Sequence, residues 1–288
     1  MRILKPYSLT QALEFLKHNK GALPIAGFTG IAPALHREKS ETESKIASAA
    51  VGIDMSMLDE LKRINIDGNG IEFGALVTYS DIIKADLPLQ YKAIVQAAAA
   101  TGTPQVRNRG TIGGNLATAS PTADLLTSLC VFDAVVKIES LESGARNVSM
   151  KELFVSPVTC IKENELITSV FIKPLPSNVR SCFMKIGRRA GSVVSLVNMA
   201  AAAVVKDRAF AECYVCAGCV APHPVRFYKL ESFVVGKTYE DIVREEASVK
   251  SMIQDSINPE SDLHADAEYR KKVTEKMFFK LLEDFISI

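Results

Sequence analysis

The residues best suited to bind an anion lie at positions 107–115, where three glycines stand among hydroxyl, amide and guanidinium groups. Glycine has no Cβ, so the N–H groups beside it can approach a phosphate closely, and the chain can adopt positive φ. Gly113 and Gly114 are therefore expected to form a concavity that fits a diphosphate. The alternative is a tight turn between two core elements, which glycine pairs by themselves favour.

The same stretch matches neither of the two common nucleotide-binding fingerprints, G-x-x-x-x-G-K-[ST] and G-x-G-x-x-G. A P-loop and a Rossmann dinucleotide site are therefore not supported. Composition and spacing alone indicate an anion loop and nothing more specific.

A second glycine loop, residues 26–30, follows a predicted buried strand at 23–26 and precedes the apolar run 31–35. If a helix begins in that run, its first N–H groups could face a phosphate. The alternative is an ordinary strand-to-helix turn.

The elements that would position these loops are helices and strands of both kinds. Ser8 and Gln11 fit a capping box, which predicts a helix from residue 9 to about 19. Ser120 and Pro121 suit the cap and first position of another helix, with Asp124 in its first turn. Residues 101–115 show no period. The remaining predictions are strands at 50–55, 64–66 and 71–73, a hairpin turn at 67–70, and helices at 80–84, 89–100 and 125–131.

A composition change at residues 173–178, with two prolines and a polar pair, predicts the domain boundary. Beyond it the pattern is α+β. The expected elements there are strands at 197–205 and 209–220, and amphipathic helices at 239–254 and 265–286. In the last helix an apolar stripe recurs every four residues: Tyr269, Val273, Met277, Leu281 and Phe285.

Three groups of residues could be mistaken for sites. Cys213, Cys216 and Cys219 have an iron–sulfur-like spacing, but alternation along a strand would point Cys216 away from the other two, which favours a core role. The Arg188–Arg189 pair could clamp a phosphate, although a solvated or interface pair explains it equally well. The histidines lack metal-ligand spacing, so neither a metal nor a catalytic residue is assigned; they are His18, His36, His223 and His264.

Bulk composition excludes several classes of protein. A chain of 288 residues that is 48% hydrophobic and 23% charged is long enough for substantial cores. With 34 basic and 33 acidic residues, the net charge of +1 gives no general attraction for nucleic acid or membrane. No apolar run reaches the length of a signal peptide or a membrane span. Six cysteines without a secretion signal favour a reduced, cytoplasmic setting.

The two loops occur together in the order and spacing of a known family. Residues 103–124, with the core Thr111-Ile112-Gly113-Gly114-Asn115, closely resemble the second FAD motif of the FAD-binding subunits of the molybdenum hydroxylases, the group of xanthine, nicotinate and carbon monoxide dehydrogenases. Residues 24–33 resemble the first FAD motif. Weaker resemblance covers nearly the whole chain, at residues 73–80, 165–168, 183–189, 261–263 and 269–270.

The resemblance implies an α+β fold: a vanillyl-alcohol-oxidase-like (PCMH-type) FAD-binding domain at 1–175, with two α/β subdomains at about 1–55 and 56–175, and a smaller α+β domain at 176–288. It implies backbone and hydroxyl donors to the FAD phosphates from both loops, Asp124 close by, Leu166 and Ile167 at the edge of the flavin or adenine, and Lys185 near the isoalloxazine ring or a phosphate. The implied cofactor-binding residues are Ile25, Ala26, Gly27, Phe28, Thr29, Gly30, Ile31, Thr101, Thr111, Ile112, Gly113, Gly114, Asn115, Asp124, Leu166, Ile167 and Lys185.

This chain departs from the family in the first motif, which usually reads Ala-Gly-Gly-Thr-Asp. Phe28 replaces the second glycine, and Gly30 replaces the acid. A bulky residue does not freely adopt positive φ, so the turn is expected to be reshaped, with Gly30 providing the flexibility.

The function implied is electron transfer through FAD, from a small subunit with two [2Fe-2S] clusters to an acceptor such as NAD, while a large molybdopterin-binding subunit hydroxylates a substrate. Purines, nicotinate-like heterocycles, aldehydes and carbon monoxide all remain open as that substrate, with N-heterocycles slightly preferred. Two alternatives are a stand-alone reductase similar to the UDP-N-acetylenolpyruvoylglucosamine reductases, and a flavin-deficient assembly subunit.

Overall fold

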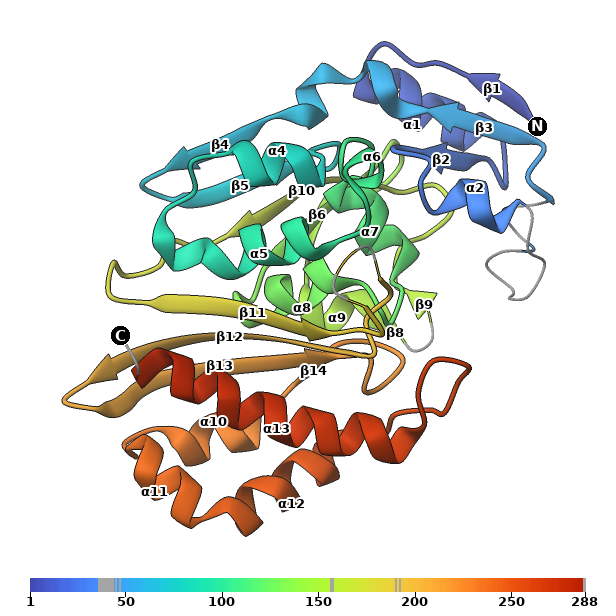
Figure 1. Ribbon diagram of the computed structural model, residues 1–288. Helices are drawn as coiled ribbons and strands as arrows, with labels where there is room; N and C mark the ends of the chain where they lie inside the picture. The colour runs from blue at the N-terminus through green and yellow to red at the C-terminus, as the bar shows by residue number, and fades with distance from the viewer. Residues whose placement is uncertain are drawn as a thin grey trace. The chain divides into compact units, whose positions relative to one another are not determined.

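A computed structural model describes residues 1–35, 44, 46, 48–155, 158–189, 191 and 193–286. The chain divides into two compact units, and neither is continuous in sequence. Unit 1 comprises residues 1–85, 103–118 and 134–174, and unit 2 comprises residues 86–102, 119–133 and 175–288. Figure 1 labels the elements of both units.

Unit 1 begins with a parallel sheet of order β1-β3-β2, formed by β1 (Arg2–Leu4), β2 (Leu23–Ile25) and β3 (Val51–Asp54). α1 (Leu9–His18) packs its apolar face, Ala12, Leu13 and Leu16, into the core beside Ile53. The Ser8 side chain accepts the amide of Gln11 as predicted. The Gln11 side chain accepts the amide of Tyr7, one residue earlier than in a capping box.

The second sheet of unit 1 is antiparallel and has the order β4-β5-β10-β6-β7. The predicted hairpin at its edge is confirmed, because β4 and β5 pair directly around residues 68–69. The strands are β4 (Ile64–Asp67), β5 (Gly70–Gly74), β6 (Val135–Ser140), β7 (Gly144–Ser149) and β10 (Leu166–Ile172), with a separate pair, β8 (Phe154–Val155) and β9 (Val158–Thr159). The other helices are α2 (Ile31–Ala34), α4 (Tyr79–Lys84), α6 (Pro104–Arg107), α7 (Ile112–Thr118), α9 (Met150–Leu153), η1 (Met55–Met57) and η2 (Asp59–Lys62).

Unit 2 is built on an antiparallel sheet of order β11-β12-β13-β14 with helices on both faces (Figure 1). α13 lies against one face of β12, and α8 lies against the other. The strands are β11 (Arg180–Ile186), β12 (Val197–Lys206), β13 (Ala209–Gly218) and β14 (Val225–Arg226). The helices are η3 (Leu89–Tyr91), α5 (Lys92–Ala100), α8 (Asp124–Val131), α10 (Tyr228–Val234), α11 (Tyr239–Arg244), α12 (Glu246–Ser256) and α13 (Ala267–Ile286).

The composition of β12 follows from its central place in this sheet. Residues 197–204 are all buried, as expected for a strand covered on both faces. Val197, Met199 and Ala201 point into the core beneath α13, whereas the alternate positions, including Asn198, face α8. The predicted strands at 197–205 and 209–220 are thus confirmed apart from their ends.

Three predicted elements are wrong in detail. Residues 101–115, expected to be irregular, contain α6 and the start of α7. The helix expected from Pro121 begins at Asp124, because residues 120–123 form a turn closed by the Ala123 amide and the Ser120 carbonyl. The helix expected at 239–254 is two helices, α11 and α12, that meet at Glu245, where ψ is 25°.

The terminal helix confirms its predicted stripe over most of its length. Val273, Met277, Leu281 and Phe285 are buried, while Tyr269 at the start is 42% exposed. Within the described ranges, no helix combines the length and the apolarity that a membrane crossing requires.

Candidate functional site

The first glycine loop leaves β2 and passes directly over the backbone of residues 109–110. A Cβ at Gly27 would lie 1.8 Å from the Arg109 carbonyl oxygen, so no side chain fits at this position. The loop continues beside α7, since a Cβ at Gly30 would lie 3.6 Å from Thr118 Oγ1. The two loops that the sequence singled out are therefore neighbours in unit 1.

The conformation of this loop differs from the one expected. Phe28 itself has positive φ, 66°, whereas Gly30 has a helical φ of −86°. The expected transfer of flexibility to Gly30 is therefore wrong. The left-handed conformation disfavours residues with a Cβ by roughly 1–2 kcal/mol, so Phe28 adopts it at a cost.

The backbone of this loop presents donors that have no internal partner. Among the residues that the structure describes, nothing accepts a hydrogen bond from the amides of Gly27, Phe28, Thr29 or Gly30. α2 follows at Ile31, so these amides lie at the start of a helix. Unpaired amides at such a position suit an anion.

In the second glycine loop, residues 107–115, backbone amides are bonded within the protein. The Ile112 amide donates to the Val77 carbonyl (2.9 Å), and the Gly113 amide donates to the Ala75 carbonyl (2.9 Å). A Cβ at Gly113 would lie 2.7 Å from that carbonyl oxygen. Gly113 is therefore required for packing α7 against residue 75, and its amide is already occupied.

Polar side chains of α7 remain available beside the first loop. Thr111 Oγ1 accepts the Gly114 amide (3.1 Å), which leaves the hydroxyl hydrogen to donate elsewhere. The Asn115 Oδ1 atom is buried and has no partner among the described residues. A buried acceptor of this kind is normally satisfied, so the atom is suited to a ligand hydroxyl.

Leu166 and Ile167 lie at the start of β10 in the same unit. They are 5% and 8% exposed, and the Leu166 side chain belongs to the core cluster with Leu13 and Met55. A register shift follows Ile167 where β10 pairs with β6. Both side chains are thus largely packed inside unit 1.

Asp124 and Lys185, predicted from separate motifs, form an ion pair in unit 2. Lys185 Nζ lies 2.7 Å from Asp124 Oδ2 and also donates to the carbonyls of Ala100 (2.8 Å) and Val193 (3.1 Å). These three bonds use all three ammonium hydrogens. Thr101, the remaining predicted residue, donates its hydroxyl to the Ala97 carbonyl of α5 (2.8 Å).

Three polar residues around Asp124 were missed by the sequence analysis. Ser195 Oγ (2.5 Å) and Asn198 Nδ2 (3.0 Å) donate to Asp124 Oδ1, and Thr127 Oγ1 donates to Asn198 Oδ1 (2.6 Å). Burial raises the pKa of Asp124, and Lys185 and the other hydrogen bonds oppose this shift. An asparagine within the apolar run 197–205 was the signal that could have revealed the cluster.

The cysteine triplet is part of the core. Cys213 lies in the cluster beneath α13, and Cys216 faces Cys130 of α8, so the predicted opposition of these two side chains is confirmed. Cys219 lies beyond β13 with φ 66°, where strand alternation no longer applies. Burial raises the pKa of Cys219 to about 12. Within the described ranges no group of three or more His, Cys, Asp or Glu residues could hold a metal.

Arg188 binds backbone carbonyls, donating to Leu263 (2.7 Å) and His264 (2.9 Å). Arg189 donates to the Gly191 carbonyl (3.2 Å). His18 and His264 are exposed and His223 is partly buried, while His36 lies outside the described residues.

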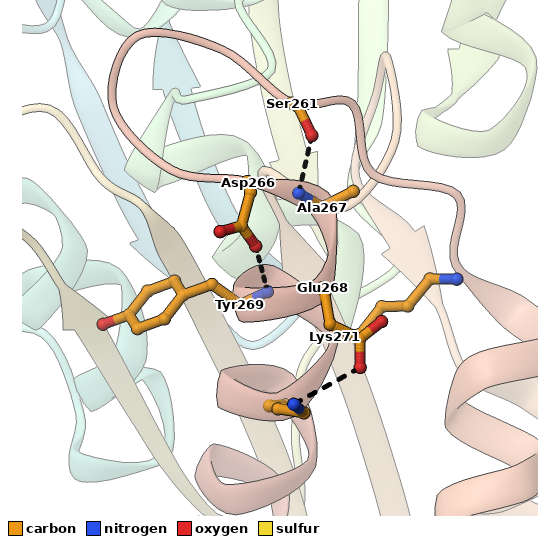
Figure 2. A pocket seen from close by; sticks show the side chains of 7 residues that line it. Ser261, Asp266, Ala267, Glu268, Tyr269 and Lys271 are labelled. Carbon is orange, nitrogen blue, oxygen red and sulfur yellow. Dashed lines mark hydrogen bonds and ion pairs between the residues drawn. The ribbon is translucent and has the colours of Figure 1, made fainter.

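A shallow hollow of about 520 Å³ lies at the start of α13 (Figure 2). Two of its polar groups cap the helix, because Ser261 accepts the Ala267 amide and Asp266 accepts the Tyr269 amide. None of the predicted cofactor-binding residues lines it.

Comparison with solved structures identifies the fold. The chain superposes on CO dehydrogenase from Oligotropha carboxidovorans with a TM-score of 0.88 and 23% identity, covering 98% of this chain and 96% of that one. Quinoline 2-oxidoreductase from Pseudomonas putida 86 gives a TM-score of 0.85 and 23% identity, with coverage of 99% and 98%. The predicted α+β fold is confirmed.

Sequence relatives agree. The chain is 30% identical over 280 residues to the glyceraldehyde dehydrogenase medium chain of Sulfolobus acidocaldarius, covering 96% of this chain and 95% of the relative. It is 28% identical over 296 residues to the nicotinate dehydrogenase FAD-subunit of Eubacterium barkeri, with coverage of 98% and 94%. Residues 1–176 match the family described as FAD binding domain in molybdopterin dehydrogenase, and residues 182–285 match the CO dehydrogenase flavoprotein C-terminal domain. The chain therefore belongs to the FAD-binding subunits of the molybdenum hydroxylases, and it is an oxidoreductase subunit with FAD as its cofactor.

Proposed function

We propose that this chain transfers electrons within a molybdenum hydroxylase complex, from iron–sulfur clusters of a small partner subunit to an acceptor such as NAD. A large molybdopterin-binding subunit would hydroxylate the substrate. FAD supplies redox chemistry that can join one-electron donors to a two-electron acceptor. The relatives named as a medium chain and an FAD-subunit support this arrangement.

One observation carries the proposal: among the described residues, nothing accepts a hydrogen bond from the amides of residues 27–30 where the first loop crosses the second. Residues 25–31 would bind the FAD diphosphate through these N–H groups, because backbone donors at a helix start stabilise a phosphate. The Gly27 contact with Arg109 holds the loop in place without blocking the amides. The chain thus fits the cofactor at this loop.

The second loop would contribute side chains, because the predicted backbone donors of residues 112–115 already donate within the protein. Thr111 has a hydroxyl hydrogen to donate, and Asn115 has a buried oxygen with no partner among the described residues that can accept from a hydroxyl of the dinucleotide. We also propose that the other implied residues of the second FAD motif, and Leu166 and Ile167, belong to the FAD site.

In unit 2 we propose Thr101 as a cofactor-binding residue, Asp124 as a nearby group that orients polar groups, and Lys185 as a residue near the isoalloxazine ring or a phosphate. Because the Lys185 ammonium already donates to three acceptors, a cofactor contact would replace one of these bonds or use the aliphatic stem. The buried carboxylate would hold the ammonium in a fixed position.

We also propose a boundary near residue 175 between an FAD-binding domain and a C-terminal domain, which the limits of the two family models support. A cytoplasmic location is proposed on the basis of six free thiols, since a reducing compartment preserves them. The hydroxylated substrate belongs to the partner subunit, and N-heterocycles, aldehydes and carbon monoxide all stay open.

The cofactor site is tested by Asn115→Ala. Because the Oδ1 atom has no partner among the described residues, its removal is expected to change the free energy of unfolding by less than about 0.5 kcal/mol while weakening FAD binding by roughly tenfold. Flavin fluorescence titration measures the affinity, and urea unfolding of the chain without FAD measures the stability. An unchanged affinity would remove Asn115 from the site.

The acceptor is tested on the chain purified with its partner subunits under anaerobic conditions. NADH is expected to bleach the oxidised-flavin absorbance, because transfer between FAD and NAD is reversible in principle. Bleaching by dithionite but not by NADH would reject NAD as the acceptor. A preparation without flavin absorbance that cannot be reconstituted with FAD would contradict the electron-transfer role itself.

A further inference from the structure

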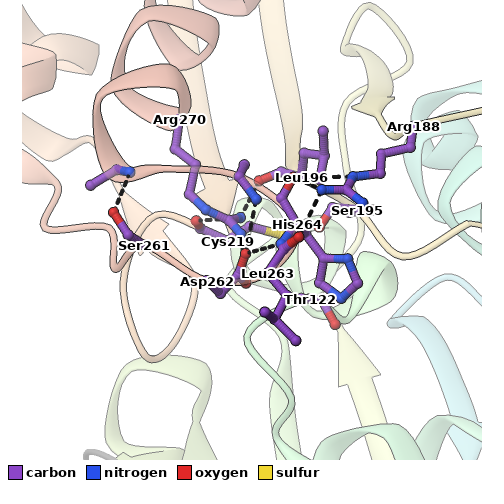
Figure 3. Close-up of polar contacts among 12 residues, drawn as sticks. Thr122, Arg188, Ser195, Leu196, Cys219, Ser261, Asp262, Leu263, His264 and Arg270 are labelled. Atoms are coloured by element: carbon purple, nitrogen blue, oxygen red, sulfur yellow. Dashed lines mark hydrogen bonds and ion pairs between the residues drawn. The ribbon is translucent and has the colours of Figure 1, made fainter.

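We propose that Arg270 is a positioning residue for the Asp124–Lys185 pair, acting through Cys219 and Ser195. All five residues belong to unit 2. Figure 3 shows the arginine, Cys219, Leu196 and Ser195 in one cluster. The link to the cofactor rests on the proposed function, whereas the chain of contacts does not.

The chain of contacts begins at Arg270. Arg270 lies in the first turn of α13 and is only 3% exposed. Its Nη1 donates to the Leu196 carbonyl and to the Cys219 carbonyl (3.3 Å). Leu196 directly precedes β12 and Cys219 directly follows β13, so one planar guanidinium ties together the ends of two paired strands.

Cys219 and Ser195 connect the Arg270 contact to the Asp124 carboxylate. Cys219 Sγ donates to the Ser195 carbonyl (3.4 Å), and Ser195 Oγ donates to Asp124 Oδ1 (2.5 Å). The Cys219 amide also donates to the Pro121 carbonyl (3.0 Å), in the turn that leads to Asp124. Cys219 has positive φ, which disfavours a residue with a Cβ and persists only where its surroundings impose it. The Arg270 contact is part of those surroundings.

The chain of contacts ends at the Asp124–Lys185 ion pair. Asp124 Oδ1 is fixed by Ser195 and Asn198, and its Oδ2 faces Lys185 Nζ at 2.7 Å. Movement of the strand ends would therefore shift the partners of Oδ1 and, with them, the carboxylate that holds the ammonium.

Stability alone does not explain a buried arginine at this place. Buried ion pairs contribute little net stability compared with apolar residues of similar volume. The Arg270 Nε atom has no partner among the described residues. Asp262, which pairs with Nη2 of the same arginine, has a side chain that is 45% exposed. What the guanidinium does provide is a fixed geometry for two carbonyl groups.

A second interpretation is that Arg270 only holds the loop of residues 258–266. Arg270 Nη2 donates to Asp262 Oδ2 (2.8 Å), and Arg188 binds the same loop through Leu263 and His264 (Figure 3). Arg188→Ala releases the loop without removing the contacts of Arg270, so it separates the two interpretations.

The test is pulsed amine labelling of the full chain without FAD, read at Lys185 by mass spectrometry. Lys185 has a side chain that is 13% exposed and three acceptors, so its labelling in the wild type requires local opening. Arg270→Lys keeps the charge but loses the planar fork, and it is expected to speed labelling of Lys185 about tenfold. Arg226→Lys is the matched control, since Arg226 is also buried in unit 2 but pairs with Glu231 and Asp133.

Faster labelling in Arg270→Lys than in either Arg226→Lys or Arg188→Ala supports the proposal. Equal labelling in Arg270→Lys and Arg226→Lys, at equal loss of thermal stability, would overturn it, because the effect would then be general destabilisation. Ser195→Ala is expected to mimic Arg270→Lys, and the double variant should add little to either. Additive effects would remove Ser195 from the path.

An FAD titration of Arg270→Lys provides a separate readout. About tenfold weaker binding, without such loss in Arg226→Lys, supports the positioning role toward the cofactor. If labelling rises while FAD affinity is unchanged, the positioning of the pair is supported and the proposed contact of the pair with the cofactor is refuted.

Discussion

The two glycine loops of unit 1 look alike in sequence but use their glycines for different purposes. Gly27 lets the first loop cross the Arg109 backbone, and in the part of the chain that the structure describes nothing accepts a hydrogen bond from the amides of residues 27–30. Gly113 lets α7 pack on Ala75, and its own amide is bonded there. Two glycine-rich loops can therefore differ, with free amides in one and close backbone packing in the other.

Both loops also contain local conformations that are unfavourable by themselves. The first places Phe28 in the left-handed region, and the second places two glycines at the start of a helix, where each costs about 1 kcal/mol relative to alanine. Such costs persist where a site or a packing contact requires them. Three substitutions test whether ligand binding or backbone packing is the requirement in each loop.

The largest effect is expected for Gly27→Val. A Cβ 1.8 Å from the Arg109 oxygen forces the two loops apart, which should lower the free energy of unfolding by at least about 3 kcal/mol and abolish FAD binding. Urea unfolding and flavin titration measure both. The control is Gly68→Val in the β4–β5 turn, where nothing lies within 4 Å of the added Cβ. Equal stability of the two variants would show that the loops are not in contact.

A smaller loss is expected for Gly113→Ala, about 1–3 kcal/mol, because the added methyl group meets the Ala75 carbonyl oxygen at 2.7 Å. Gly114→Ala is the control: its Cβ meets the Thr111 hydroxyl oxygen at 2.9 Å and the Ala26 Cβ at 4.0 Å, so a side-chain rotation that gives up one hydrogen bond relieves the contact without moving the backbone. Thermal unfolding without FAD compares them. A Gly113→Ala protein that keeps full stability but loses flavin would contradict the packing role and favour direct phosphate contact.

The smallest effect is expected for Phe28→Gly. Relief of the left-handed conformation, about 1 kcal/mol, is offset by the lost burial of Phe28, which is 39% exposed, and by the greater freedom of glycine in the unfolded chain. Stability within about 1 kcal/mol of the wild type and retained FAD binding are expected. Thr29→Gly, without positive φ to relieve, should lose more stability. The reverse order of the two variants would show that the Phe28 conformation is not strained.

The sequence predicted much of the fold because its patterns are local. The β4–β5 hairpin, the α1 cap at Ser8 and the α13 stripe all depend on contacts between near neighbours, and all three are present. The errors fall where distant contacts override local preference. α7 contains Gly113 and Gly114 and shows no amphipathic period, yet its contact with Ala75 stabilises it.

The sequence likewise predicted some residues of the candidate site and missed others. Motif resemblance identified Asp124 and Lys185, but their direct ion pair could not be read from positions 61 residues apart. Ser195, Thr127 and Arg270 were missed as members of that cluster, because each becomes informative only through partners brought together by β12, β13 and α8.

By itself the sequence determined most elements, because these depend on residue types and short spacings, and its resemblance to a known family over residues 103–124 determined the family, the FAD cofactor and the α+β class. Only the tertiary structure decided that residues 86–102 and 119–133 join the C-terminal unit, since α5 and α8 cover a face of its sheet. It also decided which of the two loops keeps amides without a partner among the described residues, because that depends on which carbonyl groups the fold brings beside each loop.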